Sequence, residues 1–454
     1  TRYKVVGFID DDPKKTGKKL EGISIHPADQ LEKILSKGNI EHLIIAIQNI
    51  SPERKQFIVE SSLQYKIRVL NVPPVKSWIN GELSFKQIRK VNIEDLLGRE
   101  PIQLNLDLIK QELQGKTILV TGAAGSIGSE LVRQILPFQP ALLVMVDIAE
   151  SPLYELELEI KDNPETAHQR FETVIGDIRN MDRMRNVFAT FRPEIIFHAA
   201  AYKHVPVMEL NPSESILNNV MGTKIIADLA MESGTRKFVM ISTDKAVNPT
   251  NIMGATKRIA EIYTQSMNSF GKTRFITTRF GNVLGSNGSV IPRFKKQIES
   301  GQPITVTDPN ITRFFMTISE ASQLVLEAAT MGKGGEIFIF DMGKPVRIDD
   351  LARKMIQLSG LELGKDIQIN YTGIRPGEKL YEELLANEEN TMPTHHRKIM
   401  IAKVKEYDFA TVSADIHELI GLFNAQNNEA IVRKMKAIVP EFLSKNSTYE
   451  QLDK

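Results

Sequence analysis

The sequence predicts an α/β protein: a doubly wound, parallel-sheet Rossmann domain with a smaller C-terminal substrate cap, preceded by a small Rossmann-like α/β domain. Short β-branched runs alternate with amphipathic helical patterns along most of the chain, which is typical of βαβ units. A glycine-rich turn at residues 121–128 follows one such run and opens a helix, as in dinucleotide-binding folds. Beyond about Val283 the order becomes irregular and richer in Gly and Pro, which indicates a cap over the sheet.

Composition excludes several classes of protein. The 454 residues predict two to three domains, and the 42% hydrophobic and 25% charged fractions are ordinary for a globular protein. The formal net charge of +1 provides no field that attracts nucleic acid, so we expect no nucleic-acid partner. The absence of cysteine excludes disulfides and thiolate metal sites, and we expect no bound metal. No apolar run approaches the roughly 18 residues of a membrane-spanning helix.

The first domain is expected over residues 1–95. It combines three strand-like runs with two helical patterns and predicts a small parallel sheet; the strands are 3–9, 42–47 and 67–72, and the helices are 28–35 and 52–64. No glycine fingerprint accompanies it, so we assign it no cofactor. The acidic turn Asp10–Asp12 is interpreted as a helix cap rather than a metal site. Residues 96–115 are the expected linker and contain an amphipathic stretch at 106–113.

The second domain is expected over residues 116–454. Six strand-like runs separated by helical patterns predict its parallel sheet: 117–120, 142–146, 172–175, 195–198, 238–241 and 275–279. Four further helices are expected in the C-terminal third of the chain, at 319–331, 349–359, 410–423 and 429–438.

The glycine-rich turn predicts an NAD site. Its glycines allow a tight turn and the close approach of a pyrophosphate to the helix N-terminus. Asp147 closes the next strand, where a carboxylate accepts hydrogen bonds from ribose hydroxyls and repels a 2′-phosphate, which favours NAD over NADP. The expected cofactor-binding residues are Gly122, Gly125, Ser126, Ile127, Gly128, Asp147, Asp177, Ile178, Ala199, Ala200 and Lys257. The alternative is a tight strand-to-helix turn without a ligand.

A hydroxyl, a carboxylate and an ammonium, from Thr243, Asp244 and Lys245, follow the strand-like run 238–241. They should therefore lie at the carboxyl edge of the sheet, where open α/β sheets bind ligands. Met253 and Lys257 are four residues apart, on one face of the next helix. We expect this stretch to carry the chemistry. The alternative is a capping acid beside a solvated lysine.

Together these segments resemble the extended short-chain dehydrogenase/reductase family, and within it the nucleoside-diphosphate-sugar 4,6-dehydratases of bacterial polysaccharide and glycan biosynthesis. The resemblance covers about residues 116–390, in TGAAGSIGSE (121–130), HAAAYKHVPVME (198–209), STDKAVNP (242–249), GATKR (254–258), RFGNVLGSNGSVIPRF (279–294), TRFFM (312–316) and RPGEK (375–379). The N-terminal part also resembles the first soluble domain of the large membrane-anchored members.

The resemblance implies a role for each residue of the triplet. Thr243 orients the C4 oxygen of the sugar, Asp244 protonates the departing C6 hydroxyl, and Lys245 removes the C5 proton. An ammonium is a poor base at its ordinary pKa of about 10.4, so we expect burial together with nearby Lys257 or cofactor charge to lower the pKa of Lys245.

Met253 departs from the broader family, which has a tyrosine at this position. A thioether performs no acid–base chemistry. The large membrane-type dehydratases, which retain the C5 configuration, share a methionine here, and we interpret Met253 as a mark of that subfamily. Asp244, aided by Thr243, is the expected substitute for the tyrosine, and Tyr202 is the alternative. Lys257 is expected to bind the nicotinamide ribose.

The substrate-binding residues implied by the resemblance come from four segments: Lys203, His204, Asn282, Arg313, Arg375 and Glu378. The two arginines can clamp a diphosphate, and Glu378 can accept hydrogen bonds from a ribose.

The expected function is NAD-dependent 4,6-dehydration of UDP-N-acetylglucosamine to the 4-keto-6-deoxy sugar nucleotide by a homo-oligomer. The alternatives are a C4 or C5 epimerase of the same fold and an inactive NAD-binding sensor or scaffold. Because the chain starts at Thr1 without an initiator methionine, we interpret it as a fragment. The resemblance implies that upstream helices anchor the full-length protein at the cytoplasmic side of the bacterial inner membrane.

Overall fold

The computed structural model describes residues 4–73, 88–91, 93, 102–383, 391–403 and 405–453. Two compact units divide the chain. Unit 1 comprises residues 1–100, 293–306 and 349–370, and unit 2 comprises 101–292, 307–348 and 371–454. Residues 96–101 of the expected linker lie outside the described residues. Unit 1 includes two segments from the C-terminal half of the chain, which the sequence patterns had placed in the second domain. The domain boundaries therefore stay a prediction.

Unit 2 is built on a nine-stranded sheet with the order β20-β21-β17-β12-β11-β10-β7-β8-β9. The strands from β17 to β9 run parallel, whereas β21 and β20 pair antiparallel at one edge. Their bounds are β7 Thr117–Thr121, β8 Leu142–Asp147, β9 Phe171–Ile175, β10 Ile195–His198, β11 Lys237–Thr243, β12 Arg274–Phe280, β17 Ile337–Phe340, β20 Thr391–Pro393 and β21 Ile399–Ala402. The six expected strands and the parallel, doubly wound fold class are confirmed.

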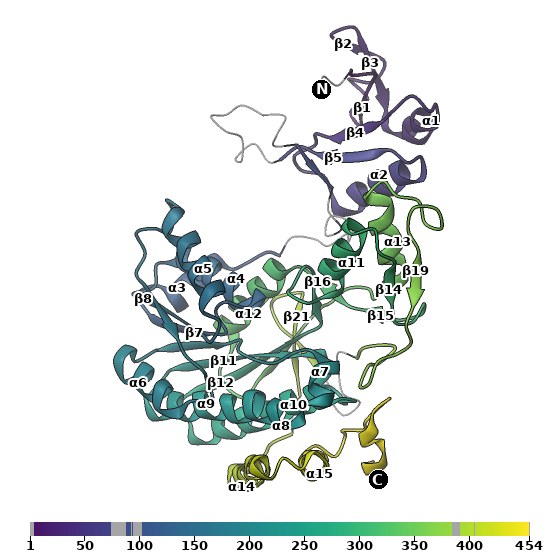
Figure 1. Ribbon diagram of the computed structural model, residues 1–454. Coiled ribbons are helices and arrows are strands. Elements are labelled where there is room, and N and C mark those ends of the chain that lie inside the picture. The colour runs from purple at the N-terminus through teal and green to yellow at the C-terminus, as the bar shows by residue number, and fades with distance from the viewer. Residues whose placement is uncertain are drawn as a thin grey trace. The chain divides into compact units, whose positions relative to one another are not determined.

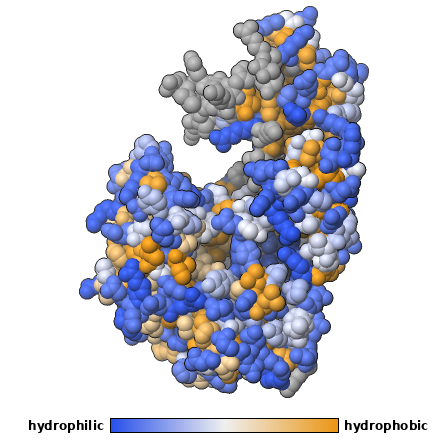
Figure 2. Space-filling view, in the orientation of Figure 1, coloured by the Kyte–Doolittle hydropathy of each residue, from blue (hydrophilic) through white to orange (hydrophobic). Residues whose placement is uncertain are grey.

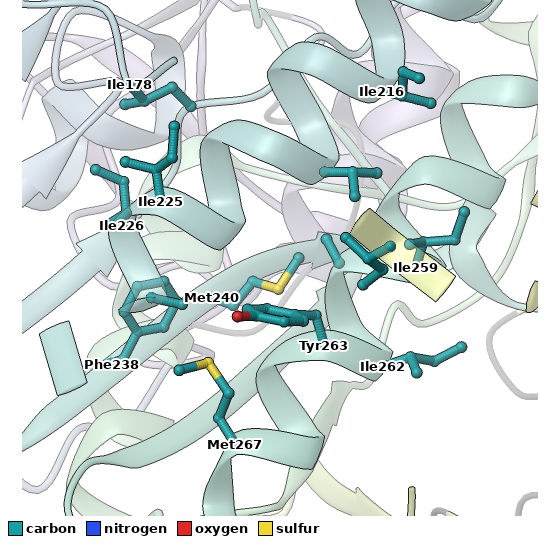
Figure 3. Packing of buried hydrophobic residues seen from close by; sticks show 14 of the residues in the cluster. Ile178, Ile216, Ile225, Ile226, Phe238, Met240, Ile259, Ile262, Tyr263 and Met267 are labelled. Atoms are coloured by element: carbon teal, nitrogen blue, oxygen red, sulfur yellow. The ribbon is translucent and has the colours of Figure 1, made fainter. Parts of the chain in front are cut away.

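Helices cover both faces of this sheet (Figure 1). One apolar cluster joins the sheet to α6, α9, α10, α14 and α15, and a second joins it to α3, α4, α5 and α12. Figure 3 shows the first cluster, in which Phe238 and Met240 of β11 pack against Ile259 and Tyr263 of α10. The helices are α3 Leu106–Leu113, α4 Ser126–Ile135, α5 Glu150–Asp162, α6 Met181–Phe191, α9 Thr223–Glu232, α10 Ile252–Ser266, α12 Ile318–Met331, α14 Phe409–Gly421 and α15 Asn428–Ile438.

The strand order places a switch point at the centre of the sheet. The chain proceeds outward from β7 through β8 to β9, and then returns to β10 on the other side of β7. The connections after β7 and β10 therefore leave in opposite directions and open a crevice at the carboxyl edge, where such sheets bind ligands.

Shorter elements surround this edge of unit 2. They are α7 Val205–Leu210, α8 Pro212–Ser215, the π-helix η6 Ile216–Gly222, the 3₁₀-turn η7 Asp244–Ala246, β13 Asn282–Val283, β15 Thr312–Arg313, β16 Phe315–Met316 and β18 Val346–Arg347. The pair β13–β16 is parallel and the pair β15–β18 is antiparallel. Of these elements, β15, β16 and β18 lie in the region beyond Val283 that was expected to form the cap.

Unit 1 contains two three-stranded sheets, β1-β3-β2 and β4-β5-β6, rather than one. Within these two sheets β1–β3 and β4–β5 are parallel pairs, whereas β2–β3 and β5–β6 are antiparallel. Its elements are β1 Phe8–Asp10, β2 Lys19–Leu20, β3 Ile23–Pro27, α1 Leu31–Leu35, β4 His42–Ile45, α2 Pro52–Gln64, β5 Arg68–Asn71, β6 Arg89–Lys90, α11 Val290–Glu299, β14 Ile304–Val306, α13 Ile348–Leu358 and β19 Ile369–Tyr371. The last four lie mainly in the two segments 293–306 and 349–370. An ion pair of 2.5 Å between Lys354 and Glu60 joins α13 to α2 within this unit.

The visible face of the molecule is mostly hydrophilic (Figure 2). Figure 2 shows hydrophilic residues over most of the visible face, with hydrophobic residues in small separate groups. Among the described residues, no helix has the length and apolar character needed to cross a bilayer.

Candidate functional site

The glycine-rich turn joins β7 to α4 and contains two positions that only glycine can occupy. Gly122 has a φ of 67°, and a Cβ there would lie 2.6 Å from the backbone nitrogen of Ala200. A Cβ on Gly128 would lie 2.0 Å from the carbonyl oxygen of Gly122. The first glycine thus lets β10 approach, and the last lets α4 begin directly against the turn. This explains the glycine spacing in physical terms.

The turn leaves the N-terminus of α4 open to an anion. No side chain caps this helix, whose N-cap is Gly125, so its first amides lack a side-chain acceptor. A pyrophosphate satisfies such amides and interacts favourably with the helix dipole. Ser126 and Ile127 begin the helix, and the Ser126 hydroxyl accepts a hydrogen bond of 3.2 Å from the Asn287 amide. The residues present therefore fit a dinucleotide.

The other expected cofactor residues lie at the ends of neighbouring strands. Asp147 ends β8, and its carboxylate accepts hydrogen bonds of 2.9 Å from the amides of Ala124 and Ala149, so it lies against the glycine-rich turn. Asp177 follows β9. Burial raises the pKa of its carboxyl group, but hydrogen bonds from Arg179 outweigh burial, and the pKa lies below its usual value.

Ile178 is buried, and a Cβ on Gly222 of the π-helix η6 would lie 2.6 Å from its Cδ1. Ala199 and Ala200 follow β10, beside Gly122. The structure thus brings the expected cofactor residues to one edge of the sheet, around the turn.

Thr243, Asp244 and Lys245 lie where β11 ends and the turn η7 begins. The Thr243 hydroxyl accepts a hydrogen bond from the Lys245 amide, which caps the turn, and donates one of 2.9 Å to Asp244 Oδ1. The Lys245 ammonium is 3.1 Å from the same oxygen. The three residues thus form one hydrogen-bonded group at the carboxyl edge, as expected from their position after the strand.

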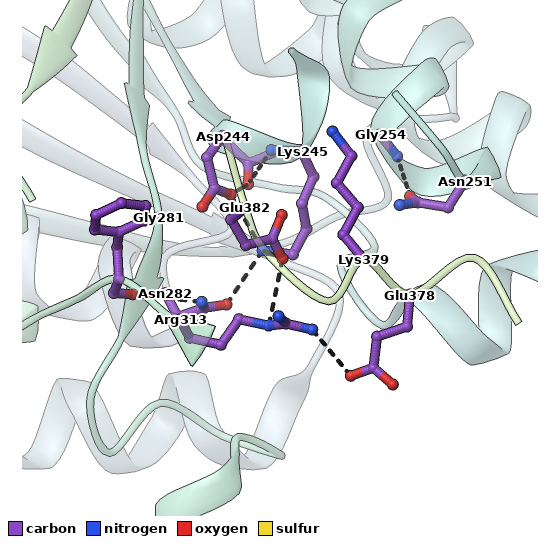
Figure 4. Close-up of polar contacts among 12 residues, drawn as sticks. Asp244, Lys245, Asn251, Gly254, Gly281, Asn282, Arg313, Glu378, Lys379 and Glu382 are labelled. Atoms are coloured by element: carbon purple, nitrogen blue, oxygen red, sulfur yellow. Dashed lines mark hydrogen bonds and ion pairs between the residues drawn. The ribbon is translucent and has the colours of Figure 1, made fainter. Parts of the chain in front are cut away.

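The Lys245 ammonium has three acceptors (Figure 4). Besides Asp244 Oδ1, Nζ lies 3.2 Å from Asn282 Oδ1 and 3.2 Å from Glu382 Oε1. Burial lowers the pKa of Lys245, but the charges of Asp244 and Glu382 outweigh it, and the pKa is raised. The expected lowering is therefore wrong in direction, because a second carboxylate stands beside this amine.

Asp244 is fully buried and only one of its carboxyl oxygens has a partner. Among the described residues no hydrogen-bond partner faces Oδ2, which points at Gly281, where a Cβ would lie 2.8 Å away. Burial raises the pKa of Asp244, the charge of Lys245 opposes this, and the net direction is upward. A carboxyl group with one unpaired oxygen and a raised pKa is suited to hold a proton and donate it.

Met253 and Lys257 lie on α10, and both are buried. Burial lowers the pKa of Lys257 to about 8, although the charge of Glu261 acts in the opposite direction. Tyr202, the alternative acid, is 38% exposed, and its amide is held by Asn219 of the π-helix at 2.8 Å. Among the described residues, no hydrogen bond joins its hydroxyl to the group around Asp244.

Lys203 and His204 lie on the other side of the site. Burial, together with the charge of Lys245, lowers the pKa of Lys203. Burial also lowers the pKa of His204, with smaller effects from the charges of Lys203 and Arg375. The His204 ring lies against Gly288, where a Cβ would be 2.5 Å from Cε1. Both residues are nevertheless exposed by their surface area, so the burial that lowers the two pKa values is only partial.

Arg313 is engaged by carboxylates. Its guanidinium pairs with Glu378 at 3.0 Å and with Glu382 at 3.4 Å, and it is 9% exposed. Arg375 also pairs with Glu378, at 3.1 Å, but its side chain is 47% exposed. In this arrangement Arg375 is the more accessible of the two arginines that were expected to clamp a diphosphate.

Sequence reasoning missed Glu382 and a buried ion cluster behind the site. In the cluster, Glu261 of α10 accepts hydrogen bonds of 2.6 Å from Ser242 and from Arg279, which fixes β11, β12 and α10 together. Glu382 lies in an ordinary charged run, EKLYEE (378–383), where neighbouring glutamates carry no distinguishing pattern. The GEK motif nearby was the only local signal.

The chain is similar to a known protein family and to several known proteins. A family model described as "Polysaccharide biosynthesis protein" matches residues 118–404. The chain is 46% identical, over 94% of its length and 71% of the relative's, to the capsular polysaccharide biosynthesis protein CapD of Staphylococcus aureus. It is 35% identical to the inverting UDP-N-acetylglucosamine 4,6-dehydratase of Campylobacter jejuni, over 61% of this chain and 79% of the relative.

A relative with a different name matches equally well. The UDP-glucose 4-epimerase of Rickettsia typhi is 35% identical over 60% of this chain and 79% of its own length. Among solved structures, Pen from Bacillus thuringiensis is 35% identical with a TM-score of 0.58, covering 64% of this chain and 89% of that one.

Proposed function

The chain belongs to the family of polysaccharide biosynthesis proteins, and on this premise we propose that it is an NAD-dependent, UDP-sugar-modifying enzyme. The reaction we propose is 4,6-dehydration of UDP-N-acetylglucosamine to the 4-keto-6-deoxy sugar nucleotide. The observation that carries this proposal is the adjacent acid and amine at the carboxyl edge, Asp244 and Lys245, 3.1 Å apart. Elimination of water across C5 and C6 needs both a proton donor and a base, whereas exchange at C4 alone needs neither at that end of the sugar.

NAD, when bound, supplies a hydride acceptor for the sugar C4 and a hydride donor for C6, so the net reaction is loss of water. Gly122, Gly125 and Gly128 shape the turn that would receive its pyrophosphate, and Asp147 would accept hydrogen bonds from its adenosine ribose. Lys257 would bind the nicotinamide ribose hydroxyls. These assignments rest on the geometry of the turn and on the strand ends around it.

The triplet would perform the elimination. Thr243 would orient the C4 oxygen, Asp244 would donate the proton on Oδ2 to the C6 hydroxyl, and Lys245 would take the C5 proton. The 3.1 Å hydrogen bond from Lys245 Nζ ends on Asp244 Oδ1, so the proton on Oδ2 would come from solvent and not along this hydrogen bond. The form with both groups neutral is a competent acid and base, and it contains the same number of protons as the ion pair.

Met253 would then be a wall of the pocket, because its thioether neither donates nor accepts a proton. Lys203, His204, Asn282 and Arg375 would contact the sugar nucleotide. Arg313 and Glu378, whose charges are paired in the structure, would do so only after exchanging partners.

The second candidate is a C4 epimerase of the same fold, favoured by the 35% identity to a protein named UDP-glucose 4-epimerase. An epimerase requires no proton donor at C6. It therefore predicts that the Asp244→Asn, Lys245→Met double variant still interconverts C4 epimers. An inactive NAD-binding scaffold predicts cofactor binding without turnover.

Incubation with UDP-N-acetylglucosamine in deuterated water tests these candidates. We expect a product that has lost water and that carries deuterium at C5, detected by mass spectrometry and proton NMR. The double variant should bind NAD but release no water. A C4 epimer without water loss would favour the epimerase, and unchanged substrate in the presence of bound NAD would refute the dehydratase.

A further inference from the structure

A second buried carboxylate, Glu382, faces the acid–base pair from a distant part of the chain. We propose that Glu382 is a positioning residue that, through its charge, keeps a second proton on the Lys245–Asp244 pair and thereby sets the pH range of catalysis. The catalytic part of this inference rests on the proposed function, whereas the protonation of the pair does not.

The geometry assigns Glu382 to this pair. Its side chain is 3% exposed, and Oε1 lies 3.2 Å from Lys245 Nζ and 3.4 Å from Arg313 Nε. Among the described residues Asp244 forms an ion pair with Lys245 alone, whereas Glu382 forms ion pairs with both Lys245 and Arg313. If one of the two carboxyl groups holds a proton, it is therefore Asp244, because removing charge from Glu382 would leave Arg313 and Lys245 both less well compensated.

The charges around the pair come from several elements. Arg313 reaches Glu382 from β15, and Glu378 takes part of the charge of that arginine. The charge of Lys379, in the same segment, lowers the pKa of Glu382. Lys203, in the loop after β10, and Lys245 repel each other electrostatically, and this repulsion lowers the pKa of Lys203. Within this set Glu382 is the carboxylate that contacts Lys245 and also acts on Asp244.

The unpaired oxygen supports a neutral Asp244. Oδ2 is buried beside Gly281 with no partner among the described residues, and an ionised oxygen in that position would be expensive to bury. Burial raises the pKa of Glu382, but the charges of Lys245 and Arg313 bring it below its usual range. Glu382 thus stays ionised while Asp244 holds its proton.

The consequence is a pair that rests with two protons, one on Lys245 and one on Asp244. It must lose one proton to become an acid beside a free amine, and a second loss removes the acid. Glu382 is negative throughout, so it opposes both losses, and both apparent pKa values of the pair should be higher with Glu382 than without it. The proton given up goes to solvent, and no bond other than N–H or O–H changes in this step.

The pH profile of kcat/KM provides the first test, with three variants in one segment. Glu382→Gln should move both limbs of the profile to lower pH by about one unit or more. Glu382→Asp, which keeps the charge, should move them back toward the wild-type profile. Glu383→Gln is the matched control, because Glu383 is exposed and contacts Asn248 and Lys379 instead. A lower rate in Glu382→Gln with unmoved limbs would show a merely structural role and overturn the proposal.

Infrared spectroscopy of the protein without substrate provides a test that is independent of turnover. At neutral pH the wild type should show the band of a protonated carboxyl group, absent from Asp244→Asn. In Glu382→Gln this band should disappear at a lower pH than in the wild type. Persistence of the band over an unchanged pH range would overturn the inference even if the enzyme is a dehydratase. If Glu382→Gln lowers the pH at which the band disappears, but the protein turns over no UDP-sugar, the result would support the inference and refute the proposed function.

Discussion

Replacing Lys257 with methionine should stabilise the cofactor-free protein, although it removes a residue we assign to cofactor binding. Burial lowers the pKa of Lys257 from 10.5 to about 8. Each pKa unit corresponds to about 1.36 kcal/mol, so burying the charged ammonium costs about 3 kcal/mol at neutral pH. Methionine has a similar length and no charge to desolvate. We therefore expect Lys257→Met to raise the free energy of unfolding at about pH 7 by up to about 3 kcal/mol.

The sign of the pH dependence follows from proton counting. Between about pH 8 and 10.5 the unfolded chain binds a proton at this lysine that the folded protein has lost, so the wild type gains stability as the pH rises through this window. Below the folded pKa both states are protonated and the cost is complete. The advantage of Lys257→Met should therefore be largest near neutral pH and should shrink as the pH approaches the ordinary lysine pKa.

Urea denaturation of the NAD-free proteins, followed by circular dichroism at about pH 7 and about pH 10, measures this difference. Lys272→Met, at an exposed position, is the control for loss of a lysine and should change stability little. Added NAD should stabilise the wild type more than Lys257→Met, because the variant lacks the ammonium that would bind the ribose. A variant less stable than the wild type by the same amount at both pH values would refute the reasoning.

Three further predictions concern single positions. Gly281→Ala would place a Cβ 2.8 Å from Asp244 Oδ2, so we expect turnover to fall at least about tenfold while NAD affinity, measured by calorimetry, is unchanged. Gly128→Ala would place a Cβ 2.0 Å from the Gly122 carbonyl oxygen and should abolish NAD binding in the same assay; retained affinity would contradict the assignment of this turn. Burial lowers the pKa of His198 to about 3, so its contribution to stability is lost as the pH falls from 6.5 toward 3; His198→Gln should flatten acid denaturation in that window, and an equally steep profile would count against the burial argument.

Much of the fold could be predicted from local patterns. The helix Pro52–Gln64 has its expected bounds because Ser51 accepts a hydrogen bond at its N-cap and proline occupies its first turn, both of which are local signals. The strand Ile195–His198 also has its expected bounds, since four buried apolar or aromatic residues define it. The opening strand was less predictable: 3–9 was expected and Phe8–Asp10 was found, because an apolar run near a chain end pairs only where a neighbour is available.

The residues of the candidate site also fall into those that local sequence patterns indicated and those that they did not. The glycine turn and the triplet Thr243–Lys245 were recognisable in the sequence, because the spacing of glycines and the position after a strand are properties of neighbouring residues. Of the three described partners of Lys245, Asp244 and Asn282 were named from the sequence, whereas Glu382 was not recognisable. Glu382 comes from a separate segment. Its charge, together with that of Asp244, outweighs burial and the opposing charge of Arg313, and it reverses the expected direction of the Lys245 pKa.

The sequence by itself therefore determined the parallel sheet and the glycine-rich turn, and it predicted Asp244 as the acid and Lys245 as the amine, which stays a prediction. Only the tertiary structure showed that a second buried carboxylate lies beside this amine, with charges that raise the pKa of Lys245 and lower that of Glu382. The physical reason is that backbone conformation follows from residues close in the chain, whereas electrostatic energies depend on distances in space and on exclusion of water. Folding alone brings Glu382 to 3.2 Å from Lys245 and buries both.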